Sequence, residues 1–261
     1  MGKSDIMIEK DKWLSDVLDR DCYNLQSFKP SILSALFPSI IMASDQNKDL
    51  MVSTKIWLDG NDNSEAVMAL SSLGFYSVEI NLLYELRPAD YRYWKIHEEV
   101  FQIEEICPDN FFQYLSDIAW IANTCFHFSR FHLDPELKDQ ADRVKLCWAV
   151  AGMTKERGDK MMITLFGNQT VGFLLSKVKG TVATIDLIGV HPGLQGRGVG
   201  RFLVNWFIQN YFHYEKLRVS TQISNVQARR LYGACGFKWV KSSQDYHFHI
   251  KRRQRGIACA G

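Results

Sequence analysis

The chain has 261 residues, 46% of them hydrophobic, and a formal net charge of +2 at pH 7. This is enough for one large globular domain or two small ones with a buried core. A charge so near neutral excludes a protein that binds nucleic acid through bulk positive charge. No apolar run approaches a membrane span and the first twelve residues lack the apolar core of a secretory signal, so we expect a cytoplasmic protein without a membrane partner.

The six cysteines are scattered, with no CxxC pair and no zinc-finger spacing. That pattern is typical of free thiols in a reducing compartment, and we expect no metal site. The basic stretch Lys251-Arg252-Arg253-Gln254-Arg255 is expected to be a solvated tail.

The amino-terminal part is typical of a compact unit of strands and helices. Residues 50–57 and 75–86 have the composition of strands, and residues 63–73 have a helical periodicity that ends before Gly74. Arg87-Pro88-Ala89-Asp90 breaks the pattern and predicts a linker. We therefore expect a smaller αβ domain over residues 1–94, a larger domain over residues 95–250 and a tail over residues 251–261.

The larger domain is predicted to open with a strand at residues 101–106 and a helix from Pro108-Asp109 through Asn123. The segment that follows, residues 126–135, sets aromatic rings beside Arg130 and two imidazoles. Aromatic faces stack on flat groups and arginine grips phosphate with two hydrogen bonds, so this segment suits a sugar linked to a nucleotide. An equally good interpretation is a partly buried loop in which Arg130 pairs with a local carboxylate such as Asp134.

Three β-rich runs follow, and the turn pairs Gly167-Asn168 and Lys179-Gly180 separate them. They predict consecutive antiparallel strands, and a helix with an apolar stripe comes after them. The predicted strands of this half are residues 161–166, 171–178, 181–190, 216–221, 238–240 and 246–250.

The most informative stretch is His191-Pro192-Gly193-Leu194-Gln195-Gly196-Arg197-Gly198-Val199-Gly200, between an apolar strand and an amphipathic helix. Glycines let the backbone turn sharply and bring several N–H groups against one ligand. The helix N-terminus adds partial positive charge, so the loop predicts a pyrophosphate site. Its spacing excludes a P-loop, because Arg201-Phe202 follows Gly200, and it also lacks the spacing of a dinucleotide fold.

Gln195-Gly196-Arg197-Gly198-Val199-Gly200 resembles the acetyl-coenzyme A loop of the Gcn5-related N-acetyltransferase (GNAT) superfamily, Gln/Arg-x-x-Gly-x-Gly/Ala. The segment from Asn225 to Tyr232 resembles the second cofactor-binding segment of that superfamily. The two residues are two helical turns apart, so both face one way. The resemblance covers residues 95–250 and implies a GNAT fold, an α/β (α+β) architecture with a mixed, mostly antiparallel sheet flanked by helices, beside the smaller αβ domain.

The resemblance also implies acetyl-coenzyme A as the acetyl donor. Asn225 is expected to contact the pantetheine arm, and Tyr232 is expected to reach the sulfur as general acid. The residues expected to bind the cofactor are Ile188, Gly189, Val190, Gln195, Gly196, Arg197, Gly198, Val199, Gly200, Arg201 and Asn225.

Within the superfamily, Ser129-Arg130-Phe131 with Asp134-Pro135, and Thr221-Gln222-x-x-Asn225, are similar to motifs of the bacterial dTDP-amino-sugar N-acetyltransferases. These include the dTDP-fucosamine group and its relatives that act on dTDP-3-amino-3,6-dideoxyhexoses. The similarity implies a homodimer that binds a dTDP-linked amino sugar, and the residues expected to bind it are Ser129, Arg130, Phe131 and His132.

In that group Gly-Phe-x-x-Val-Glu ends the amino-terminal unit, and Gly74-Phe75-Tyr76-Ser77-Val78-Glu79 matches it. By this similarity Glu79 is expected to be the general base, and His132 or a water relay is the alternative base. The competing interpretation of Glu79 is a solvent-facing carboxylate without a catalytic role. Acyl transfer also needs a donor for the oxyanion, for which we expect a backbone N–H near residues 188–190. The rival functions are acetylation of a protein N-terminus, a lysine or a small amine, a non-catalytic acyl-coenzyme A sensor, and a glycine loop that holds another ligand.

Overall fold

The computed structural model describes residues 6–91, 100–107 and 109–252, and they form two compact units. Unit 1 contains the described residues up to Ile80, the segment Leu133–Lys138, and those from Ser242 onward. Unit 2 contains Asn81–His132 and Asp139–Lys241. The predicted boundary between residues 94 and 95 lies outside the described residues, and the structure divides the chain earlier, within a strand.

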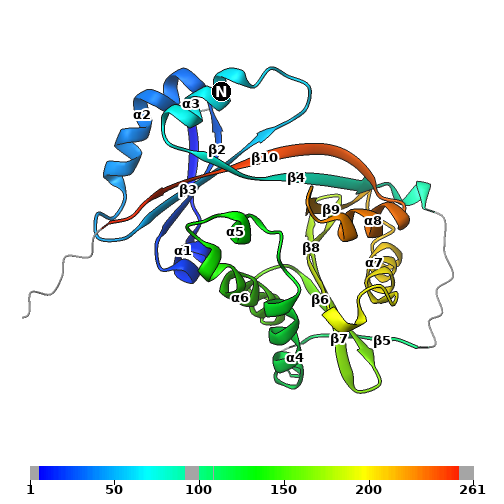
Figure 1. Ribbon diagram of the computed structural model, residues 1–261. Coiled ribbons are helices and arrows are strands. Elements are labelled where there is room, and N and C mark those ends of the chain that lie inside the picture. The colour runs from blue at the N-terminus through cyan, green and yellow to red at the C-terminus, as the bar shows by residue number, and fades with distance from the viewer. Residues whose placement is uncertain (1–5, 92–99, 108, 253–261) are drawn as a thin grey trace, which may run out of the picture. The chain divides into compact units, whose positions relative to one another are not determined.

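In unit 1 the strands follow the order β1-β2-β3-β10, and helices lie between the first three of them in sequence (Figure 1). The strands β1 and β2 pair antiparallel, β2 and β3 pair parallel, and β3 pairs antiparallel with the strand β10. Its elements are β1 (Ile6–Lys10), α1 (Lys12–Leu18), β2 (Asp21–Phe28), α2 (Pro30–Ala43), β3 (Leu50–Trp57), α3 (Ser64–Ser72), the start of β4 (Tyr76–Leu86) and most of β10 (Lys238–Ile250).

Local sequence sets the ends of these elements. The Asp11 carboxylate accepts a hydrogen bond from the Leu14 N–H at 2.9 Å and so caps α1, and Pro30 opens α2. The core of unit 1 centres on Phe37, whose ring lies 5.1 Å from that of Phe75 and 5.0 Å from that of Phe248. The predictions of a strand over 50–57 and of a helix within 63–73 are confirmed.

Unit 2 is built on a sheet with the order β4-β9-β8-β7-β6-β5. All of its neighbours pair antiparallel except β8 and β9, which are parallel. Its elements are η1 (Pro88–Asp90), β5 (Gln102–Glu105), α4 (Phe111–Thr124), α5 (Arg130–Leu133), η2 (Lys138–Gln140), α6 (Ala141–Met153), β6 (Lys160–Phe166), β7 (Gln169–Lys179), β8 (Val182–Val190), η3 (Pro192–Leu194), α7 (Val199–Asn210), β9 (Lys216–Gln222) and α8 (Val226–Ala234).

Helices cover both faces of this sheet (Figure 1). On one face α4 and α6 pack on β6–β8 around Phe173 and Leu175. On the other, α7 comes so close to β7 that a Cβ on Gly172 would stand 3.0 Å from the Val199 side chain. The mixed, mostly antiparallel sheet flanked by helices is therefore confirmed. Among the described helices, none combines the length and the apolar content that crossing a bilayer requires.

Several predicted details are wrong. Residues 238–240 and 246–250 belong to one strand, because Ser243, Gln244 and Asp245 pair with β3 despite their low strand propensity. The helix predicted from Pro108-Asp109 begins at Phe111, and Pro108 lies outside the described residues.

The basic tail is described only to Arg252, and these first two residues are tied to unit 1. The Lys251 ammonium lies 2.6 Å from the Glu136 carboxylate, and the Arg252 guanidinium donates to the Ser44 hydroxyl at 2.7 Å. The Lys251 side chain is nevertheless 72% exposed, as expected for a solvated tail, and residues 253–261 lie outside the described part of the chain.

Candidate active site

The site begins where the neighbouring strands β8 and β9 stop pairing. Among the described residues their parallel pairing ends at Ile185 and Val219, whereas β8 stays paired with β7 as far as Val190. The His191 N–H donates to the Val171 carbonyl of β7 at 2.9 Å. Because successive N–H groups of a strand point to opposite sides, those of Val190 and Ile188 point away from β7, toward the side that β9 leaves. From the sequence we expect the antiparallel pairing to be interrupted at residues 188–190; instead it continues to Val190, and the parallel pairing with β9 is the one that stops before these residues.

The thiol of Cys125, at the end of α4, already occupies part of this strand end. Burial raises the pKa of this thiol to about 12. The same sulfur would lie 3.1 Å from a Cβ on Gly189. The sulfur thus lies against Gly189, and the N–H groups of Ile188 and Val190 are the candidate oxyanion donors of this strand end.

In the glycine loop between β8 and α7, the absence of side chains at the glycines leaves the backbone accessible to a ligand. Gly196 has φ +77° and Gly198 has φ +93°, both in the left-handed region that other residues rarely adopt. A Cβ at either position would meet no atom within 4 Å, so conformation and not crowding requires glycine, and the space beside the loop is open. Such an open loop before a helix fits a ligand that lies against the backbone.

Helix α7 directs its first N–H groups at this open space. Gly198 is the N-cap, and the Phe202 N–H makes the first helical bond, to the Gly198 carbonyl at 2.9 Å. The N–H groups of the three residues before Phe202 lie outside the helical ladder by geometry. Exposed Arg197 and Arg201 add positive charge, so the N-terminus of α7 can hold a pyrophosphate.

The ring of His191 stacks on Trp120 with centroids 4.3 Å apart, and its Nδ1 accepts from the Gly193 N–H at 3.1 Å. These two contacts fix the start of the loop. The sequence predictions did not include it, because Trp120 is seventy-one positions away from His191 and carries no local motif.

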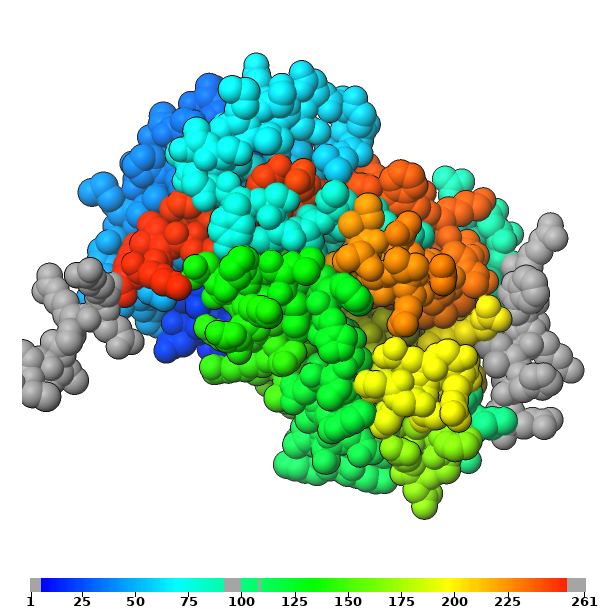
Figure 2. Space-filling model, viewed as in Figure 1, coloured from blue at the N-terminus to red at the C-terminus, as the bar shows by residue number. Residues whose placement is uncertain are grey.

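Helix α8 meets the loop at Gly200, where a Cβ would stand 3.1 Å from Leu231 and 3.7 Å from Val190. Figure 2 shows the loop and α8, yellow and orange, side by side on one face. Asn225 is the N-cap of α8, and its Oδ1 accepts from the Ala228 N–H at 3.0 Å. Its side-chain oxygen is thus occupied, and its amide N–H groups are what it can offer a ligand.

Tyr232 lies on α8 and is buried between Tyr84 and Phe237, with ring centroids 6.1 and 6.2 Å away. Burial raises the pKa of Tyr232 above its ordinary value. The residue is therefore a neutral phenol at physiological pH and can donate a proton. Among the described residues its hydroxyl has no hydrogen-bond partner, so that proton is not committed to a neighbouring group.

The four residues predicted to bind the substrate, Ser129 to His132, differ in their exposure and in their contacts. Ser129 is buried, and its hydroxyl lies 2.7 Å from His132 Nδ1, while His132 Nε2 lies 2.9 Å from the Asp142 carboxylate. Burial lowers the pKa of His132, against the opposing effect of Asp142. With both ring nitrogens engaged, His132 can act as a base only by giving up a partner. Phe131 is a buried core residue.

Arg130 keeps its guanidinium 5.0 Å over the Phe131 ring and is only partly buried, so within this segment it is the side chain that can still reach a ligand. The alternative partner Asp134 instead accepts from Tyr76.

A cluster of cations and aromatic rings lies beside the segment. The Lys145 ammonium sits over the rings of Trp148 at 4.6 Å and Phe126 at 5.2 Å, and the Arg157 guanidinium stacks on Trp148 at 3.8 Å. The Trp148 indole N–H donates to Asp186 at 2.7 Å. Because Asp186 directly follows the last β8 residue that pairs with β9, the cluster adjoins the strand end.

Glu79 lies on the part of β4 that belongs to unit 1 and is buried. The competing interpretation of a solvent-facing carboxylate is therefore wrong for the folded chain.

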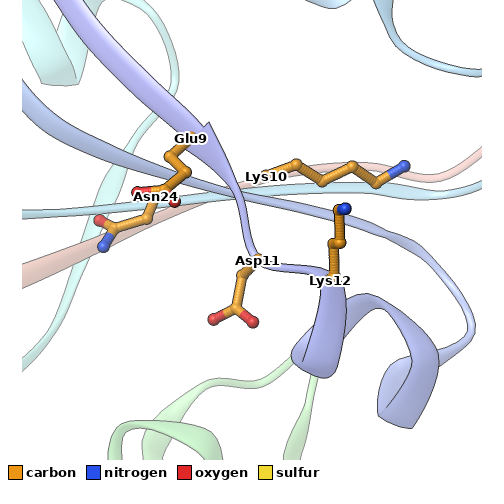
Figure 3. A pocket seen from close by; sticks show the side chains of 5 residues that line it. All are labelled: Glu9, Lys10, Asp11, Lys12 and Asn24. Carbon is orange, nitrogen blue, oxygen red and sulfur yellow. The ribbon is translucent and has the colours of Figure 1, made fainter.

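A surface pocket of about 500 Å³ lies elsewhere in unit 1 (Figure 3). The Lys10 ammonium there is paired with Asp21 at 2.6 Å, and Asp11 caps α1. The lining includes none of the predicted site residues, so we do not assign the candidate site to it. The lining residues are Glu9, Lys10, Asp11, Lys12 and Asn24.

Comparison with known proteins agrees with this geometry. Residues 115–237 match the model of the acetyltransferase (GNAT) family, and this range contains the glycine loop, α7 and α8. The chain is 26% identical over 136 residues to the spore coat polysaccharide biosynthesis protein SpsD of Bacillus subtilis (strain 168). That match covers 51% of the chain and 46% of the relative, so it spans less than half of the relative's length.

Solved structures share the fold at low identity. A functionally unknown conserved protein from Staphylococcus epidermidis ATCC 12228 has a TM-score of 0.61 and 14% identity, over 87% of this chain and 84% of that one. A GCN5-related N-acetyltransferase from Kribbella flavida has a TM-score of 0.60 and 11% identity, over 87% and 80%. These similarities show the fold and do not identify a substrate.

Proposed function

We propose that this chain, a GNAT-type acetyltransferase over residues 115–237, transfers the acetyl group of acetyl-coenzyme A to the amine of a dTDP-linked amino-6-deoxyhexose, at C3 or C4. The observation that carries the proposal is the open glycine loop at the N-terminus of α7, next to the strand end where β9 leaves β8. The polysaccharide-biosynthesis relative supports a sugar acceptor, as does the similarity of Ser129-Arg130-Phe131 to dTDP-amino-sugar enzymes.

The loop fits the pyrophosphate of coenzyme A. Gly196 and Gly198 leave open space beside the backbone, and the first N–H groups of α7 can donate to phosphate oxygens, with Arg197 and Arg201 as countercharges. The amide of Asn225 would contact the pantetheine arm. When bound, acetyl-coenzyme A supplies a thioester carbonyl carbon and a thiolate leaving group.

In the proposed mechanism the residues of the chain move two protons away from the sugar ammonium. Glu79 accepts the first and passes it to solvent, which frees the nitrogen to bond to the carbonyl carbon. The Ile188 N–H donates to the carbonyl oxygen as negative charge develops there. Tyr232 gives its proton to sulfur as the carbon–sulfur bond breaks, and the second nitrogen proton restores it.

The proposal includes a cytoplasmic homodimer. Free thiols at Cys22 and Cys235, both buried, agree with a reducing compartment. The dimer rests on the resemblance to the sugar-nucleotide group, and size-exclusion chromatography with light scattering of the full chain tests it.

The direct test is release of free thiol from acetyl-coenzyme A with a panel of acceptors: dTDP-linked 3-amino- and 4-amino-6-deoxyhexoses, a lysine peptide and a simple amine. Selective turnover of one dTDP-sugar supports the proposal and assigns the position of the amine. Turnover of the peptide or amine alone would move the chain to another acceptor class, and binding without turnover would favour a sensor.

Glu79→Gln in the same assay tests the base. We expect a loss in kcat of roughly 100- to 10,000-fold, the usual value of a positioned acid or base. Exposed Glu65 in the same unit supplies the matched control, Glu65→Gln, which should leave the rate unchanged. Equal rates for the two variants would remove Glu79 from the mechanism.

A further inference from the structure

Unit 1 buries three side chains of metal-ligand type that the proposed acetyl transfer does not use. Asp134, His247 and His249 each offer a ligand atom, and these atoms lie within 4.8 Å of one another. The side chains of Asp134 and His247 are 0% exposed and that of His249 is 6% exposed. Buried ligand-type side chains of this kind are far rarer than exposed acidic groups and require a chemical reason.

The two imidazoles reach Asp134 because they alternate on β10, so that both point to one face of the strand. His247 Nδ1 lies 2.5 Å from Asp134 Oδ2, and His249 Nε2 lies 2.9 Å from the same oxygen. The two rings are nearly perpendicular, with centroids 5.9 Å apart. Both imidazole nitrogens thus point at the same carboxylate oxygen.

The other oxygen of Asp134 is held by separate contacts. Oδ1 accepts from the Tyr76 hydroxyl at 2.6 Å and from the Glu136 N–H at 2.9 Å. Outer contacts that orient a carboxylate in this way are a regular part of metal sites.

We propose that Asp134, His247 and His249 bind one divalent transition-metal ion, with zinc preferred, as a structural site of unit 1. Two imidazoles and a carboxylate are ligands that zinc takes readily. Tetrahedral ligands about 2.0–2.1 Å from the ion stand roughly 3.3 Å apart. The two N···Oδ2 distances therefore need to lengthen by less than about 1 Å, while the ligand atoms, now within 4.8 Å of one another, close around the ion and a water takes the fourth position. Each imidazole then binds the ion as a neutral ring that keeps one proton, on its other nitrogen, and any second proton is released to solvent.

The site would anchor a short piece of chain. Asp134 belongs to Leu133–Lys138, a segment that packs in unit 1 although the chain on both sides of it belongs to unit 2. A bound ion would fix this segment to β10 immediately after the residues Ser129–His132. The scattered cysteines predict no metal site, and the separation of Asp134 from His247 by 113 positions leaves no spacing motif to find.

The test uses the full chain, stripped with a chelator, dialysed and then titrated with Zn²⁺ or Co²⁺. Elemental analysis should give one ion per chain, the Co²⁺ form should show the absorption bands of a tetrahedral site, and the melting temperature should rise with metal concentration. His249→Gln should weaken metal affinity at least 100-fold and Tyr76→Phe roughly 10- to 100-fold. His213→Gln, at an exposed histidine of unit 2, should bind as the wild type does.

A wild-type chain that retains less than one ion after dialysis and shows no tetrahedral Co²⁺ spectrum would overturn the proposal, and the cluster would then be a hydrogen-bonded network. Metal binding that His249→Gln leaves unchanged would mean an adventitious ion only. The wild-type stoichiometry and spectrum decide the question even if a variant does not fold. None of these readouts depends on acetyl transfer, so the failure of one proposal is distinguishable from the failure of the other.

Discussion

Substitution of Gly198, the N-cap of α7, is the most direct test of the assignment of the glycine loop to the cofactor. Its φ is +93°, and a Cβ there would point into space with no atom within 4 Å. Gly60 in unit 1 is a close match, with φ +90°, the same open surroundings and an exposed position. Substitutions at the two glycines therefore impose the same backbone strain, and we expect only those at Gly198 to affect coenzyme A.

The magnitudes separate strain from charge. Alanine in a left-handed conformation costs about 1–2 kcal/mol, so Gly198→Ala and Gly60→Ala should lose similar stability. An aspartate tolerates that conformation better, but at Gly198 it brings a carboxylate against the bound pyrophosphate. Like charges about 4 Å apart repel by about 1–4 kcal/mol between water and a protein surface, which weakens binding roughly 5- to 700-fold.

Calorimetric titration with coenzyme A measures the affinity, and thermal unfolding measures the stability of the same samples. We expect Gly198→Asp to lose affinity, with a smaller loss at high salt, while Gly60→Asp binds as the wild type does. An unchanged dissociation constant for Gly198→Asp would refute the assignment of the pyrophosphate to this loop. Equal losses for the Asp variants of both glycines would attribute the effect to folding instead.

Three further predictions concern single side chains. In steady-state kinetics, Tyr232→Phe should lower kcat roughly 10- to 1000-fold with little change in cofactor affinity. The control Tyr214→Phe should keep the wild-type kcat. Equal kcat values for the two variants would remove Tyr232 as the proposed acid. Asn225→Ala removes the N-cap of α8, which lowers the stability of the fold by about 1 kcal/mol and the melting temperature by about 2–4 °C. Asn225→Asp keeps the cap and loses only the amide that donates to the cofactor. Burial lowers the pKa of His132 below its ordinary 6.5, so the neutral ring stabilises the fold above that pH and this stability is lost as the pH falls. The melting temperature of His132→Gln should therefore drop less than that of the wild type between about pH 7.5 and about pH 5.5. An equal drop in the two proteins would contradict the assignment.

Features set by local sequence were predicted well. The β3 strand at Leu50–Trp57 agrees residue for residue, and the hairpin turns at Gly167 and Gly180 have the positive φ that their glycines indicate. The glycine loop and the helix after it also agree, because the glycines of one local motif determine the backbone there.

Features that depend on distant contacts were missed. Helix α6 was not predicted, and so neither was the Lys145–Trp148 cluster that it carries. The polar residues 242–245 interrupt the strand pattern of β10, yet β3 supplies their hydrogen-bond partners. The engagement of both His132 nitrogens likewise depends on Asp142, ten positions away on α6.

The most direct measurement of the central claim is the mass of the sugar nucleotide after incubation with the full chain and isotopically labelled acetyl-coenzyme A. The account predicts that a dTDP-linked amino-6-deoxyhexose gains one labelled acetyl group on nitrogen, and that Gly198→Asp in parallel gains little or none. A sugar nucleotide that stays unmodified while a peptide or small amine gains the label would contradict the assigned acceptor. Full labelling by Gly198→Asp would contradict the assigned cofactor loop.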